Sequence, residues 1–140
     1  MLKICISSQN KPLFAAISAR LANKACIFEN NFLDCNILVA SKNTCCNALC
    51  DVCIMDGSDF PSLSGSGRIM LPVSCGMSEK DTVTFSSIDG GRGILCVQRD
   101  IKVGKGKIEC GEYPINYDTN LSVWHNLAVC FCTVAADINI

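Results

Sequence analysis

The chain has 140 residues, of which 49% are apolar and 18% are charged, and its formal net charge is −1. A chain of this length forms one domain with an adequate core, and its apolar content excludes intrinsic disorder. Lys and Arg number 12 against 13 Asp and Glu, which disfavours a basic nucleic-acid-binding surface. We therefore predict a single domain over residues 1–140 with no nucleic-acid partner.

Twelve cysteines are an unusual number for a chain of this length. An even count is typical of a disulfide framework in small secreted domains. Here the cysteines lie inside apolar runs such as Ile4-Cys5-Ile6, where Cys behaves as a small core hydrophobe. No secretory signal is recognisable, because the apolar start breaks at residues 7–12. The apolar run at 127–136 is too short to span a bilayer. We predict buried, unpaired thiols, a cytoplasmic location and no membrane contact.

The N-terminal half alternates strand-like and helix-like segments. Four apolar segments have the length of buried strands, at residues 3–6, 26–28, 36–39 and 51–55. A helix is predicted over residues 12–22, with Pro12 in its first turn, and a short polar helix around 41–49. A further strand enters at residues 68–73, where Pro72 should interrupt the ladder or mark its end.

The second half changes to hairpin spacing. Strand-like segments occupy residues 82–86, 93–99 and 107–110, with 113–117 as an extension of the last. Asp89-Gly90-Gly91 predicts a hairpin turn, and Asp118 or Thr119 a cap for a helix over about 120–136. We predict an α/β fold that is three-layered and Rossmann-like. Its mainly parallel sheet would carry an antiparallel meander over about 81–110 and a closing C-terminal helix.

The C-terminal helix is apolar around most of its circumference. A helix of this kind must be covered on more than one side. A second copy of the chain would supply such cover, so we predict a homodimer through this helix. Cover by the meander and the first helix is the alternative. The sequence identifies no other protein partner.

A polar loop between the first strand and the first helix is the strongest local signal of a binding site. Phosphates bind at helix N-termini because free backbone N–H groups point there. This loop, Ser8-Gln9-Asn10-Lys11, has no glycine, and Lys11 is followed by Pro12 and not by Ser or Thr. Nucleotide hydrolysis is therefore not expected. The four side chains stay candidates for ligand binding.

The other chemistry-bearing residues have simpler explanations. Cys45-Cys46-x3-Cys50-x2-Cys53 resembles a metal-ligand cluster, but Cys53 lies in a predicted strand, so packing cysteines are expected instead. His125 is the only histidine, which excludes a triad or a two-histidine metal site within one chain. Asp56 follows a buried strand and is a candidate ligand, although an Asp- and Gly-rich turn has the same composition. We predict no metal, no cofactor and no catalytic residue.

Several short sequence segments resemble the central domain of the peptidoglycan Mur ligases in a shortened form. The segment at 4–17 lies where those enzymes have a glycine-rich Thr-Gly-Lys-Thr-type loop. The segment Val73 to Thr84 resembles their strand-Gly-x4-Asp/Ala-x-Val stretch, which leads into an antiparallel meander. Asn126-Leu127-Ala128-Val129 resembles their Asn-Ala-Leu-Ala helix start. The resemblance implies that Asn126 lies near a nucleotide site, and that the domains needed for ligation have no counterpart among these residues.

A second resemblance covers the first 75 residues. Asp51-Val52-Cys53-Ile54-Met55-Asp56 looks like the strand of a response-regulator receiver, which would place Asp56 at the phospho-acceptor position. A receiver has a pair of acidic residues just after its first strand, where they bind magnesium, and this chain has Ser7-Ser8-Gln9 at that place. We expect a non-catalytic cytosolic binding or regulatory module related to the Mur ligase core. A pseudo-receiver and a residual nucleotide-binding protein are the alternatives.

Overall fold

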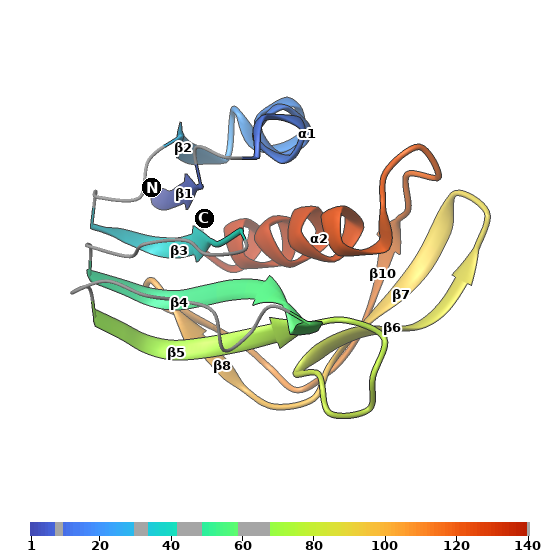
Figure 1. Ribbon diagram of the computed structural model, residues 1–140. Coiled ribbons are helices and arrows are strands. Elements are labelled where there is room, and N and C mark those ends of the chain that lie inside the picture. The colour runs from blue at the N-terminus through green and yellow to red at the C-terminus, as the bar shows by residue number, and fades with distance from the viewer. Residues whose placement is uncertain (8–9, 30–33, 42–48, 59–67, 140) are drawn as a thin grey trace.

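The structure is a computed structural model, and it describes residues 1–7, 10–29, 34–41, 49–58 and 68–139 (Figure 1). The α/β class predicted from the sequence is confirmed. In chain order the described elements are β1 (Leu2–Ile6), α1 (Lys11–Leu21), β2 (Ala25–Glu29), β3 (Cys35–Val39), β4 (Leu49–Asp56), β5 (Arg68–Cys75), β6 (Val83–Asp89), β7 (Arg92–Val97), β8 (Ile101–Val103), β9 (Gly106–Ile108), β10 (Gly111–Asn116) and α2 (Val123–Ile138).

Eight of the strands form one mixed sheet in the order β10-β7-β6-β5-β4-β3-β1-β2. Strands β1 to β6 pair in parallel, whereas β6, β7 and β10 pair antiparallel. The parallel strands are nearly continuous apolar runs, as expected for strands buried on both faces. In the sheet, β2 lies on one side of β1 and β3 lies on the other. The carboxyl ends of β1 and β3 therefore form a topological switch point, where open α/β sheets hold ligands.

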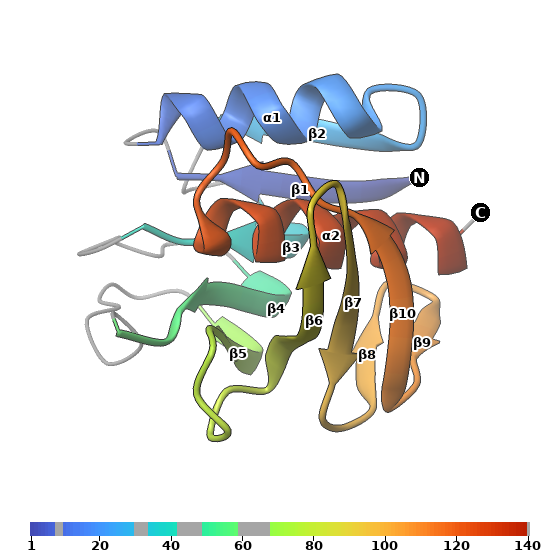
Figure 2. The same ribbon diagram turned by 90° about the vertical axis from the view of Figure 1, so that its right-hand side faces the viewer.

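Helices α1 and α2 lie side by side on the same face of the sheet (Figure 2). As predicted, α1 buries Leu13, Ile17 and Leu21, and these join the strand residues Ile4 and Ile6 in one core. A three-layer arrangement needs helices on both faces. In the part of the chain that the structure describes, the two helices cover one face.

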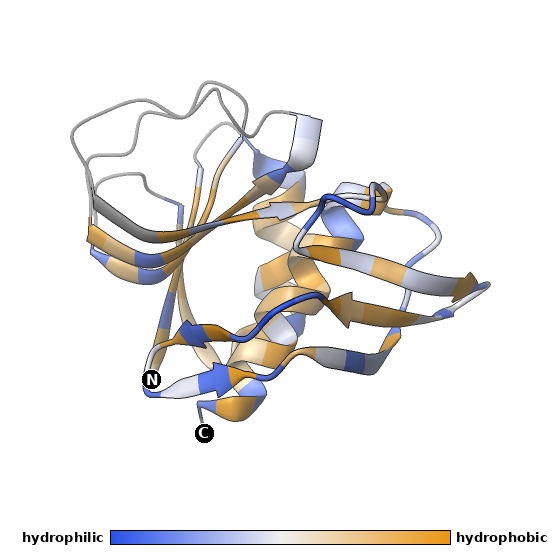
Figure 3. Cartoon of the chain, turned by 90° about the horizontal axis from the view of Figure 1, so that it is seen from below, coloured by the Kyte–Doolittle hydropathy of each residue, from blue (hydrophilic) through white to orange (hydrophobic). Residues whose placement is uncertain are grey.

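The sheet curves around α2, whose apolar residues are enclosed (Figures 1 and 3). Strands β4 to β7 and β10 contact this helix, α1 lies along it, and β9 contacts it as well. Phe131, Cys132 and Ala135 consequently have no exposed surface. Elements of the same chain therefore cover the apolar helix, which was the reason for expecting a second copy. The homodimer stays a prediction, but the apolar surface of α2 no longer supports it.

A second buried cluster, rich in cysteine, lies apart from the main core. Its members are Cys5, Cys35, Leu38, Ala40, Cys50, Cys53 and Met55. All ten cysteines in the described ranges are free thiols, and seven of them are buried. For this part of the chain, the prediction of unpaired and mostly buried thiols is confirmed. Cys45 and Cys46 lie outside the described residues.

Strands β8 and β9 form a separate two-stranded hairpin, tied to both β4 and α2. The Gly104 N–H donates to Asp51 Oδ2 at 2.9 Å, near the amino end of β4. Asn139, after the last turn of α2, accepts from the Lys105 N–H at 2.9 Å and donates to the Val103 carbonyl at 3.2 Å. These bonds fix the hairpin against the amino ends of the parallel strands.

The predicted boundaries of the antiparallel part need correction. The meander was expected over about residues 81–110, but the main sheet takes β6, β7 and β10 and leaves out β8 and β9. Ile101, Val103 and Ile108 instead point into the core beside α2, where all three are fully buried. The short helix expected at 41–49 falls mostly outside the described residues, and Leu49 begins β4.

Pro72 does not end its strand, contrary to expectation. β5 runs from Arg68 to Cys75 with Pro72 opposite Cys53 of β4. On its other side β5 pairs with β6 only at Cys75 and Val83. The preceding residues therefore have one unpaired edge, where a residue without an N–H is tolerated.

Helix α2 begins later than predicted and has a different cap. Ser122, and not Asp118 or Thr119, is the N-cap, and its hydroxyl accepts from the His125 N–H at 3.1 Å. Asp118 belongs to the preceding turn, where its carboxylate accepts from the Asn120 N–H at 2.9 Å. Among the described residues, neither helix is both long enough and apolar enough to cross a membrane.

Candidate functional site

The predicted loop site lies at the carboxyl end of β1, beside the first turn of both helices. Asn10 is the N-cap of α1, and its Oδ1 accepts from the Leu13 N–H at 3.2 Å. Lys11 is turned outward, with its ammonium 3.3 Å from Glu29 Oε1 on β2. Ser8 and Gln9 lie outside the described residues. Lys11 therefore contacts an acidic side chain of its own chain at the position where a P-loop lysine would face phosphate.

His125 lies in the first turn of α2 and contacts the same loop. Its Nε2 is 3.4 Å from Asn10 Nδ2, so the amide can donate to the neutral ring. Desolvation lowers the pKa of His125 below its ordinary value of 6.5. The two residues join the N-terminal ends of α1 and α2. His125 thus has a structural role, as a hydrogen-bonded link between the two helices.

Asn126 holds the turn before α2 through its side-chain amide. It is 2% exposed, and its Oδ1 accepts from the Asp118 N–H at 2.9 Å. Its Nδ2 donates to the carbonyls of Asp118, Leu121 and Ser122 at 2.9, 3.3 and 3.0 Å. Both ends of the amide are thus engaged with backbone. Asn126 shapes the loop and offers little hydrogen-bonding capacity to a nucleotide.

Asp56 ends β4 and is also bonded locally. Its Oδ1 accepts from both the backbone N–H and the hydroxyl of Ser58 at 3.1 Å, as in a turn stabilised by Asp. Beside it, the buried Asp81 carboxylate approaches Gly57 and Gly76 so closely that a Cβ on either glycine would overlap it. No group of three or more His, Cys, Asp or Glu in the described ranges could hold a metal ion.

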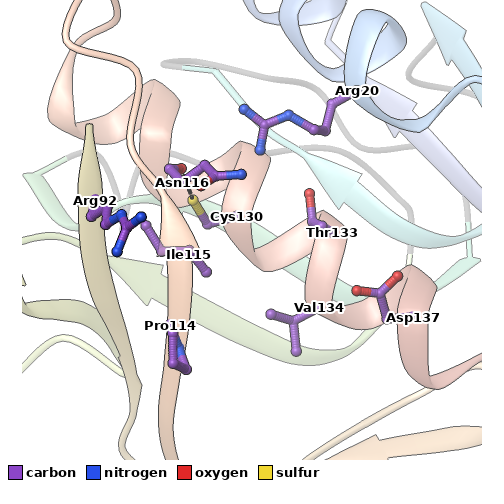
Figure 4. A pocket seen from close by; sticks show the side chains of 9 residues that line it. All are labelled: Arg20, Arg92, Pro114, Ile115, Asn116, Cys130, Thr133, Val134 and Asp137. Atoms are coloured by element: carbon purple, nitrogen blue, oxygen red, sulfur yellow. Dashed lines mark hydrogen bonds between the residues drawn. The ribbon is translucent and has the colours of Figure 1, made fainter.

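The side chains with unused binding capacity lie elsewhere, in a cavity of about 380 Å³ between α1, α2 and β10 (Figure 4). Arg20 in the last turn of α1 and Arg92 at the start of β7 both extend toward β10. The remaining lining residues come from β10 and one side of α2: Pro114, Ile115, Asn116, Cys130, Thr133, Val134 and Asp137. We call this cavity the arginine pocket.

The charges of the arginine pocket are unbalanced. Neither guanidinium makes an ion pair or hydrogen bond with any described residue. Asp137 is the one acidic residue in the lining, and it already pairs with Lys24 at 3.0 Å. The side-chain amide of Asn116 likewise has no described partner. The pocket thus offers two positive charges and an amide to a ligand.

Two side chains of α2 in the lining of the arginine pocket are hydrogen-bonded to backbone carbonyls. Cys130 is 1% exposed, and its thiol donates to the Asn116 carbonyl at 3.7 Å. Burial raises the pKa of Cys130 to about 11, and the nearby Arg20 charge opposes that rise. The thiol is therefore protonated at neutral pH and acts as a packing group. The hydroxyl of Thr133 donates to the Val129 carbonyl at 2.8 Å, which leaves its lone pairs free to accept.

No sequence motif indicates the arginine pocket. Arg20 and Arg92 are 72 positions apart along the chain and belong to no motif. The one available signal was that Arg20 ends a helix whose apolar face is already satisfied by Leu13, Ile17 and Leu21. The convergence of these groups is produced by the packing of α1 against α2 and by the β7–β10 pairing.

No protein-family model matches this chain, and neither a curated protein nor a solved structure matches it. The resemblances to the Mur ligase central domain and to receivers stay predictions. Chemically, the arginine pocket can bind an anion, because a guanidinium group donates to carboxylate or phosphate oxygens in a fixed fork geometry. Its volume lies within the range of small-molecule sites.

Proposed function

We propose that this chain is a non-catalytic cytosolic binding or regulatory module that takes an anionic small molecule in the arginine pocket. The observation that carries the proposal is that Arg20 and Arg92 face one cavity without a described acidic partner. Both arginines are exposed, so each guanidinium can reach an anion, to which it donates charge-assisted hydrogen bonds. The ligand neutralises a charge imbalance that the chain itself leaves.

The residues at the carboxyl end of the parallel strands support the non-catalytic part of the proposal. Asn10, Asp56 and Asn126 are bonded to backbone groups, and Lys11 contacts Glu29. Their roles are consistent with a Rossmann-like core, related to that of the Mur ligases, in which the nucleotide loop has become a structural element. The relationship to the Mur ligases and a third layer, on the other face of the sheet, are part of this proposal.

The experiment is a titration of the ¹⁵N-labelled protein with inorganic phosphate, followed by NMR. We expect the amide signals of Asn116 and Thr133 and the Nε–H signals of the two arginines to shift in a saturable manner. Arg20→Gln and Arg92→Gln should each weaken binding by about tenfold, the cost of one charge-assisted contact. Lys102→Gln removes the same charge from an exposed strand position and is the matched control.

The proposal fails if phosphate shifts none of these signals. It also fails if Lys102→Gln weakens phosphate binding as much as the two arginine variants do, because the effect would then reflect net charge alone. Folding of each variant is checked by its urea midpoint. Exposed arginine substitutions of this kind should change the free energy of unfolding by less than about 0.5 kcal/mol.

A further inference from the structure

A second cavity, of about 550 Å³, continues from the arginine pocket along α1. Arg20 lines both cavities. Beyond it the second cavity is bordered by Pro12, Ala15, Ala16 and Ala19 on α1 and by Asp118, Leu121 and Val129 on the opposite side. We call this cavity the alanine channel.

The alanine channel exists because α1 has small side chains where it faces α2. Ala16 is half-buried and Ala15 and Ala19 are exposed, so their methyl groups leave space beside the helix. Val129 and Leu121 form the opposite apolar wall. The carboxylate of Asp118, the one acidic group in this lining, is already bonded to the Asn120 N–H. Apart from its shared arginine, the channel therefore offers mostly aliphatic contact.

The two cavities follow one side of α2 in sequence order. Val129 borders the alanine channel. The arginine pocket begins at the next residue, Cys130, and continues with Thr133 and Val134 about one turn further on and Asp137 about two turns further on. A single extended molecule can thus contact both, with Arg20 at the junction.

We infer that the ligand is an anionic amphiphile, whose phosphate or carboxylate head binds Arg20 and Arg92 and whose aliphatic segment lies in the alanine channel. This inference rests on the proposed function and adds the apolar part of the ligand. Both headgroups satisfy the same guanidinium geometry, so the shared chemistry is a compact oxyanion on an aliphatic chain. Burying several methylene groups strengthens binding without further polar contacts.

The test compares octyl phosphate, octanoate, 1-octanol and inorganic phosphate by isothermal titration calorimetry below their aggregation limits. Octyl phosphate is expected to bind at least about tenfold more tightly than inorganic phosphate. Octanoate should compete with octyl phosphate for the same site. 1-Octanol has the chain without the anion and should bind at least about tenfold more weakly than octyl phosphate.

Variants separate the two halves of the site. Ala15→Gln narrows the alanine channel with a residue that suits a helix. It should bring octyl phosphate affinity down toward that of inorganic phosphate and leave inorganic phosphate binding unchanged. Ala22→Gln places the same side chain at the exposed end of α1, outside both linings, and should change neither. Arg92→Gln should weaken the binding of both octyl phosphate and inorganic phosphate.

The outcomes distinguish this inference from the proposed function. If octyl phosphate and inorganic phosphate bind equally well, the aliphatic contact is overturned while the anion pocket stands. The same holds if Ala15→Gln leaves octyl phosphate binding intact. If 1-octanol binds as tightly as octyl phosphate, the anionic head is overturned. If no anion binds, the proposed function fails and this inference fails with it.

Discussion

At the scale of single residues, one buried and one half-buried side-chain amide connect segments that lie outside regular secondary structure. Asn126 and Asn139 each bond to backbone groups on both the oxygen and the nitrogen side of the amide. Removing either amide would leave its backbone partners without a hydrogen bond, and this costs free energy where those partners are buried. The two asparagines therefore matter more for stability than their size suggests.

Asn126→Ala should lower the free energy of unfolding by roughly 2–4 kcal/mol, because the variant removes four hydrogen bonds at a buried position. Urea denaturation followed by circular dichroism measures the change. Asn120→Ala, an exposed neighbour in the same turn, is the control and should cost less than about 0.5 kcal/mol. Equal costs for the two variants would contradict the role assigned to Asn126.

His125 should make the stability of the protein depend on pH. Desolvation lowers its pKa in the folded state, so the unfolded chain takes up the proton first as the pH falls. The contribution of His125 to the free energy of unfolding is therefore complete above about pH 6.5, and it is lost as the pH falls through the lowered pKa of the folded state. Protonation also abolishes the Nε2 acceptor used by Asn10.

Urea midpoints at pH 7.5 and pH 5 measure this dependence in the native protein and in His125→Gln. We expect the native protein to lose more stability than the variant between the two values. An identical loss in both proteins would show that other groups determine the acid sensitivity.

At the scale of elements, the β8–β9 hairpin depends on its attachments. Two strands of three residues each are too short to be stable alone. The bonds to Asp51 and Asn139 and the burial of Ile101, Val103 and Ile108 compensate for that shortness. The hairpin should therefore open locally when one attachment is removed.

Asn139→Ala should speed hydrogen exchange in residues 101–108 and leave exchange in β1 and β4 unchanged. The expected loss of stability is about 1–2 kcal/mol, since three hydrogen bonds to a half-buried side chain disappear. Lys107→Ala in the same hairpin breaks an ion pair between exposed side chains and should cost at most about 0.5 kcal/mol. Hydrogen exchange measured by mass spectrometry would contradict the prediction if both variants behaved alike.

At the scale of the whole molecule, one core joins the concave face of the sheet, both helices and the hairpin. Together with the separate cysteine-rich cluster, this core explains how a chain with twelve cysteines folds with ten described thiols unpaired. Small sulfur side chains fill the core in place of larger aliphatic ones. Full burial raises the pKa of Cys75 and of Cys132, which keeps both thiols protonated.

Iodoacetamide should therefore discriminate between the cysteines of the native protein. Cys110 is exposed and should be modified first, whereas Cys75 and Cys132 should react only after unfolding in urea. Peptide mapping by mass spectrometry follows each site separately, and the denatured protein supplies the reference in which all sites react. Modification of Cys132 at the rate of Cys110 in the native state would contradict the described burial.

The sequence by itself determined the local elements. Helical spacing of Leu13, Ile17 and Leu21 defined α1, and Asp89-Gly90-Gly91 defined the β6–β7 turn, because these patterns depend on neighbouring residues alone. It also indicated that the cysteines are core residues. Asn10 was correctly placed between a strand and a helix, whereas Lys11, predicted in the same loop, is the first residue of α1.

Only the tertiary structure decided which side chains remain free to bind. Asn126, Asp56 and Lys11 are already bonded within the chain, and their partners could not be read from spacing. Arg20 and Arg92 line one cavity because α1 packs on α2 and β10 pairs with β7, contacts between segments far apart in sequence. Local patterns encode secondary structure, whereas a site made by distant segments depends on how the core packs.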